Sequence, residues 1–515
     1  MATPSEKLAE SLELLKTIQD KGIVAIKSSE LSKVHRVRLI KNGFLKEVTK
    51  GWYISTPSDE QPGDSTSWYA SYWHFCAGYL ADRYGDDYFI SPDQSLLLHS
   101  GNWTVPQQLI IRTTKKTNHG TPLPDGTSLW HWTSSIPKSA AFVTIEGIRM
   151  LTLSSSLINC TPAVFTKNPT DTRTALAMIK DSSEITGLLL QGEHSTIAGR
   201  LAGAFRSIGR ERIADDIIKT MHAAGYGVRE TNPFKTIIPQ ELAAKEYSPY
   251  VNRIKLLWYE MREVVIAHFP AAPGIPSNHE AYMKRVEEIY VTDAYHSLSI
   301  ERYRVTPELI ERVRGGAWDS TNNAEDKKQR DAMAARGYWQ ATQKVRETIQ
   351  KILNGGNAGI AADKDHGDWY RELFAPGVAA GLLKSIDLAG YRNQTVFISA
   401  SKHVPMSPDG VRDVMPAFFE LLEKETEAPV RAVLGHFIFV YIHPYMDGNG
   451  RMGRFLMNVM LASGGYPWTV IPVEARKTYM EALEKASVDR NIEDFTKFMA
   501  YLVSEGMKGR PVAAI

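Results

Sequence analysis

The sequence predicts a multidomain protein with three parts: a small basic module at the N-terminus, a mixed α/β middle region, and a nearly all-helical C-terminal half. The chain has 515 residues, which is enough for two to four domains with ample core. Stretches rich in proline and glycine interrupt it at 56–64 and 225–248. Apolar residues at helical spacing dominate from residue 250 to residue 510.

The composition is that of an ordinary soluble globular protein, with 43% hydrophobic and 23% charged residues. The net charge is only +2, so any nucleic-acid signal has to be local. Two cysteines, Cys76 and Cys160, argue against a disulfide scaffold or a cysteine-rich zinc site, and they fit a reducing compartment. No apolar run reaches the roughly 18 residues of a membrane helix, and the N-terminus is unlike a signal peptide. We therefore expect a cytoplasmic protein without a membrane partner.

Residues 1–57 have the order helix, helix, helix, hairpin. Apolar spacing predicts a helix from 5 to 20, and Ser28 or Ser29 can cap a short second helix through Leu31. A third helix from 35 to 42 ends at a glycine, and 44–54 reads as a hairpin. This order predicts a winged helix-turn-helix.

Local charge favours a DNA partner for this module. Between residues 21 and 51 there are eight basic and two acidic residues, a net charge of +6. A DNA-reading third helix would present its basic side chains to phosphates and base edges; the candidates are Lys33, Arg36, Arg38 and Lys41. The alternative is a winged helix that docks proteins or forms a homodimer and never contacts DNA.

The middle region, 65–225, begins with an aromatic-rich helix from 65 to 84, more typical of a core than of a binding platform. Strand-like pieces at 88–90, 109–111, 129–131 and 141–143 follow, and helices continue from about 170 to 224. The Gly-Phe-Leu and Gly-Trp-Tyr pattern between 43 and 53 resembles AbiEi-type antitoxins. That resemblance implies a winged helix followed by an α/β body.

The stretch from His443 to Arg454 organises the C-terminal half. Apolar residues on both sides predict two buried helices with a polar bend between them. Gly448 and Gly450 let the backbone turn tightly and approach a ligand, and Asn449 between them can offer an amide. The N–H groups at the start of the second helix make an anion site.

The charged residues of this bend suit phosphoryl-group chemistry. His443 can take a proton near neutral pH. Asp447 is a hard oxygen ligand for a magnesium ion that bridges phosphates. Arg451 and Arg454 are three residues apart, so on a helix they can grip successive phosphates.

The sequence His-Pro-Tyr-Met-Asp-Gly-Asn-Gly-Arg-Met-Gly-Arg at 443–454 resembles the signature of the Fic family, with Tyr445 in place of the usual phenylalanine. The resemblance implies an all-α Fic domain at 250–510 that transfers AMP from ATP, with Mg²⁺, to a Ser, Thr or Tyr hydroxyl of a protein target. It implies a catalytic base at His443, a metal ligand at Asp447, and nucleotide contacts at Gly448, Asn449, Gly450, Arg451 and Arg454.

Ser297 and Glu301 lie four residues apart and therefore share a helix face near 293–303. Self-restrained Fic proteins carry a Ser/Thr-x-x-x-Glu segment before the core, and the resemblance implies that Glu301 pairs with Arg454 and blocks the γ-phosphate position. Arg302 replaces the usual Gly or Asn. A surface Ser and Glu pair is the structural alternative.

The resemblance also implies a β-hairpin flap between about 390 and 405, which adds the target segment as an extra strand. Two other functions stay open. One is a DNA-binding transcription regulator or antitoxin-like protein whose Fic core senses nucleotide. The other is the reverse reaction, removal of AMP from a modified protein, with Glu301 positioning water.

Overall fold

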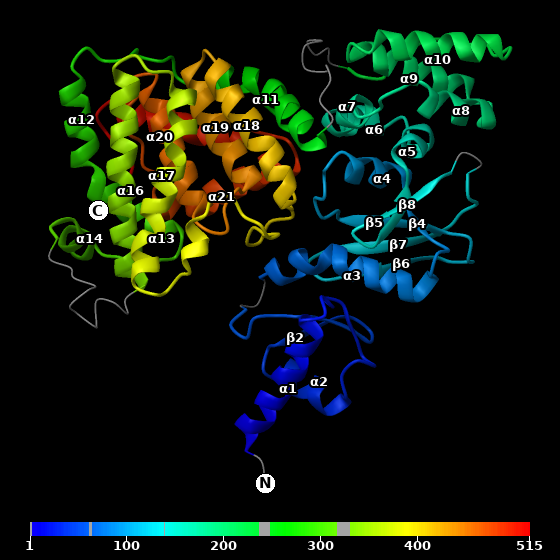
Figure 1. The fold of residues 1–515 in the computed structure, drawn as a ribbon, viewed down its shortest axis with the longest axis horizontal. Coiled ribbons are helices and arrows are strands. Elements are labelled where there is room, and N and C mark those ends of the chain that lie inside the picture. Colours follow the sequence, from blue (N-terminus) through cyan, green and yellow to red (C-terminus); the bar gives the residue numbers. More distant parts are fainter. Residues whose placement is uncertain (1–2, 61–63, 138–139, 236–247, 317–329) are drawn as a thin grey trace. The chain divides into compact units, whose positions relative to one another are not determined.

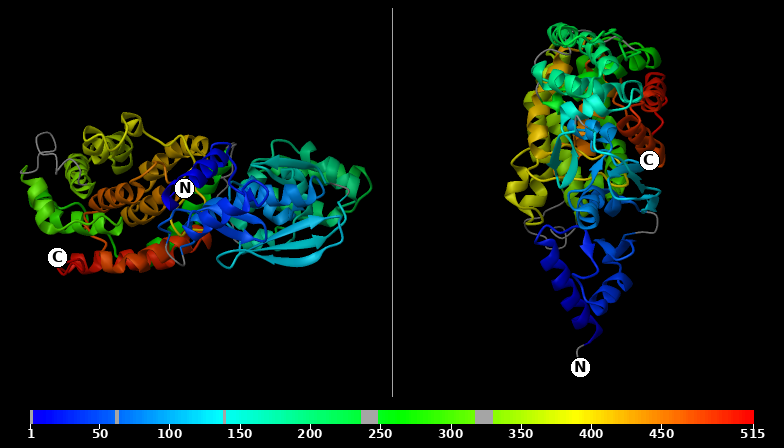
Figure 2. Two further views of the ribbon diagram at one scale, coloured as in Figure 1. Left: turned by 90° about the horizontal axis from the view of Figure 1, so that it is seen from below. Right: turned by 90° about the vertical axis from the view of Figure 1, so that its right-hand side faces the viewer.

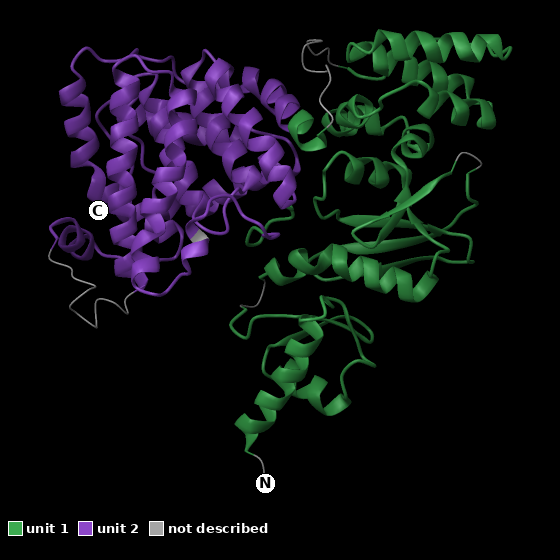
Figure 3. Ribbon diagram, in the orientation of Figure 1, with its two compact units in different colours: residues 1–253, 397–404 green, residues 254–396, 405–515 purple. Residues whose placement is uncertain are grey.

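The structure is a computed structural model, and it describes residues 3–60, 64–137, 140–235, 248–316 and 330–515. The expected linkers at 56–64 and 225–248 therefore lie partly outside the described residues. The chain forms two compact units (Figure 3). Unit 1 comprises 1–253 and 397–404, and unit 2 comprises 254–396 and 405–515. The three domain boundaries expected from the sequence stay predictions.

The N-terminal part of unit 1 has two helices and a three-stranded antiparallel sheet in the order β1-β3-β2. Its core joins both helices to the sheet through Leu15, Leu39 and Tyr53. The predicted hairpin is confirmed, whereas the predicted helix at 28–31 is wrong: those residues form a turn. Glu30 N–H bonds to Lys27 O and closes the turn, and a segment of four residues is too short to form a stable helix by itself. The elements are α1 (Pro4–Gln19), β1 (Ile26–Lys27), α2 (Lys33–Lys41), β2 (Leu45–Thr49) and β3 (Trp52–Ser55).

A four-stranded sheet in the order β4-β5-β7-β6 follows, and its β5–β7 pair is parallel (Figure 1). The predicted aromatic helix is α3 (Thr66–Tyr84), whose rings pack on Leu109, Ile111 and Leu129 of the sheet. The remaining elements are β4 (Phe89–Ile90), α4 (Pro92–His99), β5 (Gln108–Thr113), β6 (Asn118–Pro122), β7 (Ser128–Thr133), β8 (Phe142–Ile145) and β9 (Ile148–Leu151).

Unit 1 ends in a helical layer, visible in teal in the two further views (Figure 2). Its helices are α5 (Leu153–Asn159), α6 (Val164–Lys167), α7 (Pro169–Ala177), α8 (Ser183–Gly192), α9 (Ser195–Ser207) and α10 (Glu211–Ala223).

Unit 2 is helical, as the sequence predicts. The central pair is α19 (Ala428–Ile442) and α20 (Asn449–Ala462), which are buried along almost their whole length. The surrounding helices are α11 (Pro249–His268), α12 (His279–Glu288), α13 (Tyr290–Ile300), α14 (Pro307–Arg314), α16 (Arg330–Leu353), α17 (Ala358–Ala379), η2 (Ser385–Leu388), α18 (Pro408–Lys424), η3 (Val473–Ala475), α21 (Arg476–Val488) and α22 (Glu493–Met507).

The predicted β-hairpin flap is not present as strands: residues 390–406 are described, and none of them is in a strand. A strand needs a ladder of backbone bonds, and this segment makes single contacts instead. Within unit 1, Val105 N–H donates to Lys402 O at 2.9 Å, and Ala400 N–H donates to Thr66 Oγ1 at 2.9 Å. In the part of the chain that the structure describes, no helix is both long and apolar enough to cross a membrane.

Candidate functional site

His443 lies at the C-terminal end of helix α19, where the bend begins. His443 caps the helix in the left-handed conformation, with φ of 54°, while its N–H still bonds to Phe439 O at 3.0 Å. A left-handed non-glycine residue is uncommon. The reversal of the chain at this point turns the backbone from α19 into the loop that precedes α20.

The imidazole of His443 is set up to accept a proton at Nε2. Nδ1 lies 3.1 Å from Val440 O, and because a carbonyl only accepts, Nδ1 carries the proton in the neutral ring. Burial lowers the pKa of His443 to about 4. The ring is therefore neutral at pH 7, with the lone pair of Nε2 unused by any described hydrogen bond.

The loop between the two helices is closed by Asn449. Its side-chain Oδ1 accepts from Tyr445 N–H and its Nδ2 donates to Tyr445 O, both at 2.9 Å. The Tyr445 ring stacks on Tyr370 with centroids 3.8 Å apart. The loop thus uses Oδ1 and one of the two N–H groups on Nδ2, and the nucleotide contact expected of Asn449 stays a prediction. The backbone N–H of Asn449 stays available at the helix start.

The first turn of α20 lies where the sequence predicts an anion site. The initial N–H groups of any helix lack intrahelical acceptors, and they carry the positive end of the helix dipole. Gly448, with φ of 81°, precedes this turn, and a Cβ there would lie 2.8 Å from the Phe374 ring. A Cβ on Gly450 would collide with Oε1 of Glu301. The positive φ and the Phe374 ring favour glycine at Gly448, whereas a Cβ on Gly450 would require the Glu301 side chain to move.

Asp447 points its carboxylate outwards beside this turn. Its side chain is 65% exposed; one oxygen accepts from Gly448 N–H at 2.6 Å and the other lies 3.4 Å from Arg451. Among the described residues no cluster of three His, Cys, Asp or Glu could hold a metal on its own. Magnesium is commonly bound by one or two carboxylates together with substrate phosphates, and this single exposed carboxylate fits that arrangement.

Arg454 is buried in contact with the helix α13 region. Its Nε donates to Ser297 Oγ at 2.8 Å, and a terminal nitrogen bonds to Glu301 Oε1 at 2.7 Å. Burial acts to raise the pKa of Glu301, but the charges of Arg454 and Arg451 outweigh it and hold the pKa below its ordinary value. The structure therefore brings the predicted pair Ser297 and Glu301 together with Arg454, although 153 residues separate Glu301 from Arg454.

Arg451 has a different environment from Arg454. Its guanidinium lies between the rings of Tyr303, 5.2 Å away, and Phe374, 5.0 Å away. Its buried Nε has no hydrogen-bond partner among the described residues. Arg451 and Asp447 line a cavity of about 320 Å³, whose other walls are mainly apolar side chains of α16 and α17. The cavity therefore offers an anionic ligand both space and the positive charge of Arg451.

Sequence reasoning missed Arg392. Its Nε donates to His443 O at 2.8 Å and its backbone N–H donates to Pro444 O at 2.9 Å, so it supports the backbone that carries the base. Burial lowers the pKa of Arg392 to about 10. Tyr303 and Tyr370 were missed as well. No local pattern marks these residues, because each acts on a segment distant in the sequence.

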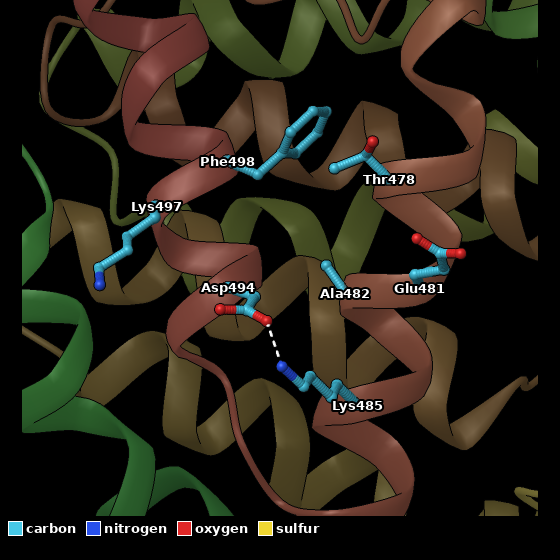
Figure 4. A pocket seen from close by; sticks show the side chains of 7 residues that line it. All are labelled: Thr478, Glu481, Ala482, Lys485, Asp494, Lys497 and Phe498. Carbon is cyan, nitrogen blue, oxygen red and sulfur yellow. Dashed lines mark hydrogen bonds and ion pairs between the residues drawn. The ribbon is translucent and has the colours of Figure 1, made fainter.

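A larger hollow of about 680 Å³ lies between α21 and α22 (Figure 4). Its charged side chains include the ion pair between Lys485 and Asp494, with nitrogen and oxygen 2.6 Å apart. Both side chains are about half exposed. Surface pairs of this kind contribute little and do not by themselves form a binding site.

The predicted DNA contacts divide into two kinds. Arg36 donates to Ser28 O and Leu31 O, and Arg38 donates to Lys7 O and Ser11 Oγ, so both arginines are used within the module itself. Lys33 and Lys41, by contrast, are exposed residues of α2. Exposed Val34 and Val37 occupy the same helix.

Comparisons with known proteins concern mainly unit 2. Residues 367–461 match the model of the Fic/DOC family. A curated protein named protein adenylyltransferase Fic from Nematostella vectensis is 29% identical over 253 residues, which are 48% of this chain and 55% of that protein. Another of the same name from Drosophila willistoni is 36% identical over 124 residues, 23% of this chain and 24% of that protein. The chain thus spans between about a quarter and just over half of these relatives.

Among solved structures, Fic-1 from C. elegans is similar at 17% identity and a TM-score of 0.37, covering 67% of this chain and 97% of that one. A Fic-domain signalling protein from Bacteroides thetaiotaomicron is similar at 16% identity and a TM-score of 0.32, covering 51% and 99%.

Proposed function

We propose that this protein is an adenylyltransferase that moves AMP from ATP onto a Ser, Thr or Tyr hydroxyl of a protein target, its own chain included, and that Glu301 restrains the reaction. The matched Fic/DOC segment and the names of the curated relatives indicate a nucleotidyltransferase. The observation that carries the proposal is the neutral His443 imidazole, with its Nδ1 fixed by Val440 O, held at the end of α19 beside the open first turn of α20.

In this mechanism the target hydroxyl oxygen attacks the α-phosphorus of ATP while its proton passes to Nε2 of His443. The new O–P bond forms as the bond from the α-phosphorus to the bridging oxygen breaks, and pyrophosphate leaves. The N–H groups of the first turn of α20 bind the α-phosphate oxygens, on which charge is concentrated. Asp447 would hold Mg²⁺, which neutralises phosphate charge. Arg451 and Arg454 bind the outer phosphates.

Restraint by Glu301 follows from where its carboxylate lies. Oε1 contacts Arg454 at 2.7 Å and lies close enough to Gly450 to exclude a Cβ there. A carboxylate in this position competes with a phosphate for both the guanidinium and the helix start. ATP must displace it before its outer phosphates reach Arg454.

The test is incubation of the full chain with Mg²⁺ and ATP labelled in the α-phosphate. Glu301→Gly should increase labelling of the chain itself or of proteins in a cell extract, and Glu301→Gly with His443→Ala should abolish it. Undiminished labelling in the double variant would reject the role of His443. The same labelled product, re-incubated without ATP, tests the reverse reaction: release of AMP by wild type and not by Glu301→Gly would favour removal of AMP.

A second candidate function, duplex DNA binding by residues 1–57, is favoured by the exposed side of α2. Val34 is 63% and Val37 55% exposed between the flanking lysines Lys33 and Lys41. Valine methyl groups can contact thymine methyls in a major groove while lysines contact phosphates. A gel shift with random duplex DNA tests it, and affinity that does not fall with salt would reject the phosphate contacts.

A further inference from the structure

One face of the sheet in unit 1 carries two exposed tryptophans. Trp130 and Trp132 are two residues apart on β7, so their side chains leave the same face. They are 38% and 47% exposed, whereas the alternate residues Leu129 and His131 are buried on the other face. Apolar side chains grouped on one exposed face are candidates for an interaction site, and these two indoles form such a group.

The neighbouring strands leave these rings accessible. In the register of the sheet, Gly120 of β6 is opposite Trp130, and Asn118 is opposite Trp132. A Cβ on Gly120 would already lie 3.5 Å from the Trp130 ring, so the absence of a side chain keeps that ring uncovered. Asn118 Oδ1 accepts from Thr133 N–H at 3.2 Å, so Nδ2 is the group that can donate a hydrogen bond beside the second ring.

Positive charge accompanies the aromatic surface. Arg112 on β5 is in register with Trp132, and its guanidinium lies 5.5 Å from that ring. The buried Nε of Arg112 has no partner among the described residues, and Lys116 is exposed in the loop that leads to β6. Between residues 107 and 133 the sequence has one acidic residue, Asp125, which lies in a turn. From outside that range, the negative charge of Asp93 acts on Arg112.

We propose that this aromatic–arginine face, defined by Arg112, Asn118, Trp130 and Trp132, binds single-stranded nucleic acid. Two successive bases stack on the indoles, Arg112 and Lys116 contact phosphates, and the Asn118 amide bonds to a base edge. Stacking surfaces with interleaved cations are the usual basis of single-strand binding, and they tolerate many sequences because every base has a flat face.

The charge decides between this partner and a glycan. Sugar rings also stack on tryptophan, but a neutral ligand gains no ion pair from the Arg112 guanidinium. A polyanion with flat aromatic groups uses both features of the surface. Duplex DNA keeps its bases paired and stacked, so it cannot offer their faces to Trp130 and Trp132.

The experiment measures fluorescence anisotropy of labelled 12-nucleotide oligo-dT and oligo-U with the full-length protein at low and moderate salt. Trp132→Ala, Trp130→Ala and Arg112→Gln should each weaken binding by about tenfold or more, and Trp132→Phe should keep most of it. Lys115→Ala is the matched control, because Lys115 belongs to the same loop but faces Tyr84 and Arg83 O of α3. Its affinity should equal that of wild type. The two oligomers report whether DNA or RNA is preferred.

Ultraviolet cross-linking of the unmodified chain keeps the proposal testable if a tryptophan variant fails to fold. Cross-linked peptides should come from 108–133. The proposal is overturned if neither oligomer binds at low salt, or if a folded Trp132→Ala binds as wild type does. It is also overturned if cross-links map only to 1–57, or if a neutral oligosaccharide competes with the oligomers.

Discussion

The bend at 443–454 and helix α2 are both rich in basic residues, but the environments of their arginines differ. The arginines of the bend can bind a ligand, whereas those of α2 are bonded within their own module. In the bend, Arg451 Nε has no hydrogen-bond partner in the part of the chain that the structure describes, and Arg454 is paired with Glu301, whose carboxylate a phosphate can replace. In α2, Arg36 and Arg38 donate to carbonyls of their own module, and only the lysines remain exposed. A guanidinium with five donors readily bonds to nearby carbonyls, so a count of positive charges does not identify ligand contacts.

The largest expected effect separates the base from the other histidines. His443→Ala should lower the rate of AMP transfer by about 10²–10⁴-fold, the usual contribution of a general base, with little change in ATP affinity. His268→Ala, an exposed histidine of the same unit, is the control and should leave the rate unchanged. Initial rates with labelled ATP in the Glu301→Gly background measure both, and equal rates for the two variants would remove His443 from the mechanism.

The pH profile sharpens this prediction. Because burial lowers the pKa of His443 to about 4, the imidazole stays neutral as the pH falls through 6.5, and protonation removes the base only near pH 4. An NMR titration of the ring resonances, assigned by comparison with His443→Ala, should find no transition for this ring between pH 5.5 and 8. A midpoint near 6.5 would contradict the environment described here.

The second expected effect concerns the contact between Glu301 and Arg454. Glu301→Gln leaves a buried guanidinium without its anion and should cost about 3 kcal/mol in the absence of nucleotide, the low end for buried pairs because the Glu301 side chain is 30% exposed. ATP with Mg²⁺ should raise the melting temperature of this variant more than that of wild type, since phosphate replaces the carboxylate.

Glu288→Gln removes an exposed carboxylate 3.9 Å from Lys284 and serves as the control for this comparison. It should change neither the melting temperature nor the response to ATP. If ATP stabilises wild type and Glu301→Gln by the same amount, Glu301 and the nucleotide do not compete for the same place.

The third expected effect concerns the turn itself. Gly448→Ala combines a left-handed φ with a Cβ 2.8 Å from the Phe374 ring, whereas Gly355→Ala places alanine at a positive φ in open space. The second change should cost about 1–2 kcal/mol of stability, and the first should cost clearly more. Denaturant unfolding of both variants measures the difference. Equal losses would mean that the loop moves freely away from Phe374.

The bend could be predicted from sequence because its chemistry lies within twelve consecutive residues, where helix geometry fixes which side chains meet. The flanking helices were predictable for the same reason. Arg392, Tyr303 and Tyr370 were not, because their contacts with the bend depend on long-range packing. The pairing of Glu301 with Arg454 was expected only through a family resemblance.

In unit 1 the hairpin at 44–54 and the strands at 88–90, 109–111, 129–131 and 141–143 were predicted, whereas β1, β6 and β9 were not. Residues Asn118–Pro122 contain no large aliphatic or aromatic side chain, so their strand conformation comes from pairing with β7 rather than from local preference. The aromatic helix at 66–84 was correctly expected to be core. The exposed tryptophans of β7 could not be distinguished from core residues, since which face of a strand is covered is decided by the rest of the fold.

The smallest expected effect tests the two kinds of basic residue on α2. Arg36→Ala and Arg38→Ala should each destabilise the N-terminal module by about 1 kcal/mol, because backbone carbonyls of the module lose a charged donor. Lys33→Ala and Lys41→Ala should leave stability within about 0.5 kcal/mol, and if α2 contacts DNA they should weaken binding uniformly and reduce the salt slope by about 1 each. Hydrogen exchange over 1–57 measures the loss of stability, and gel shifts at several salt concentrations measure the loss of DNA binding. If the lysine variants destabilise the module and leave DNA binding intact, the lysines have a structural role and do not contact DNA.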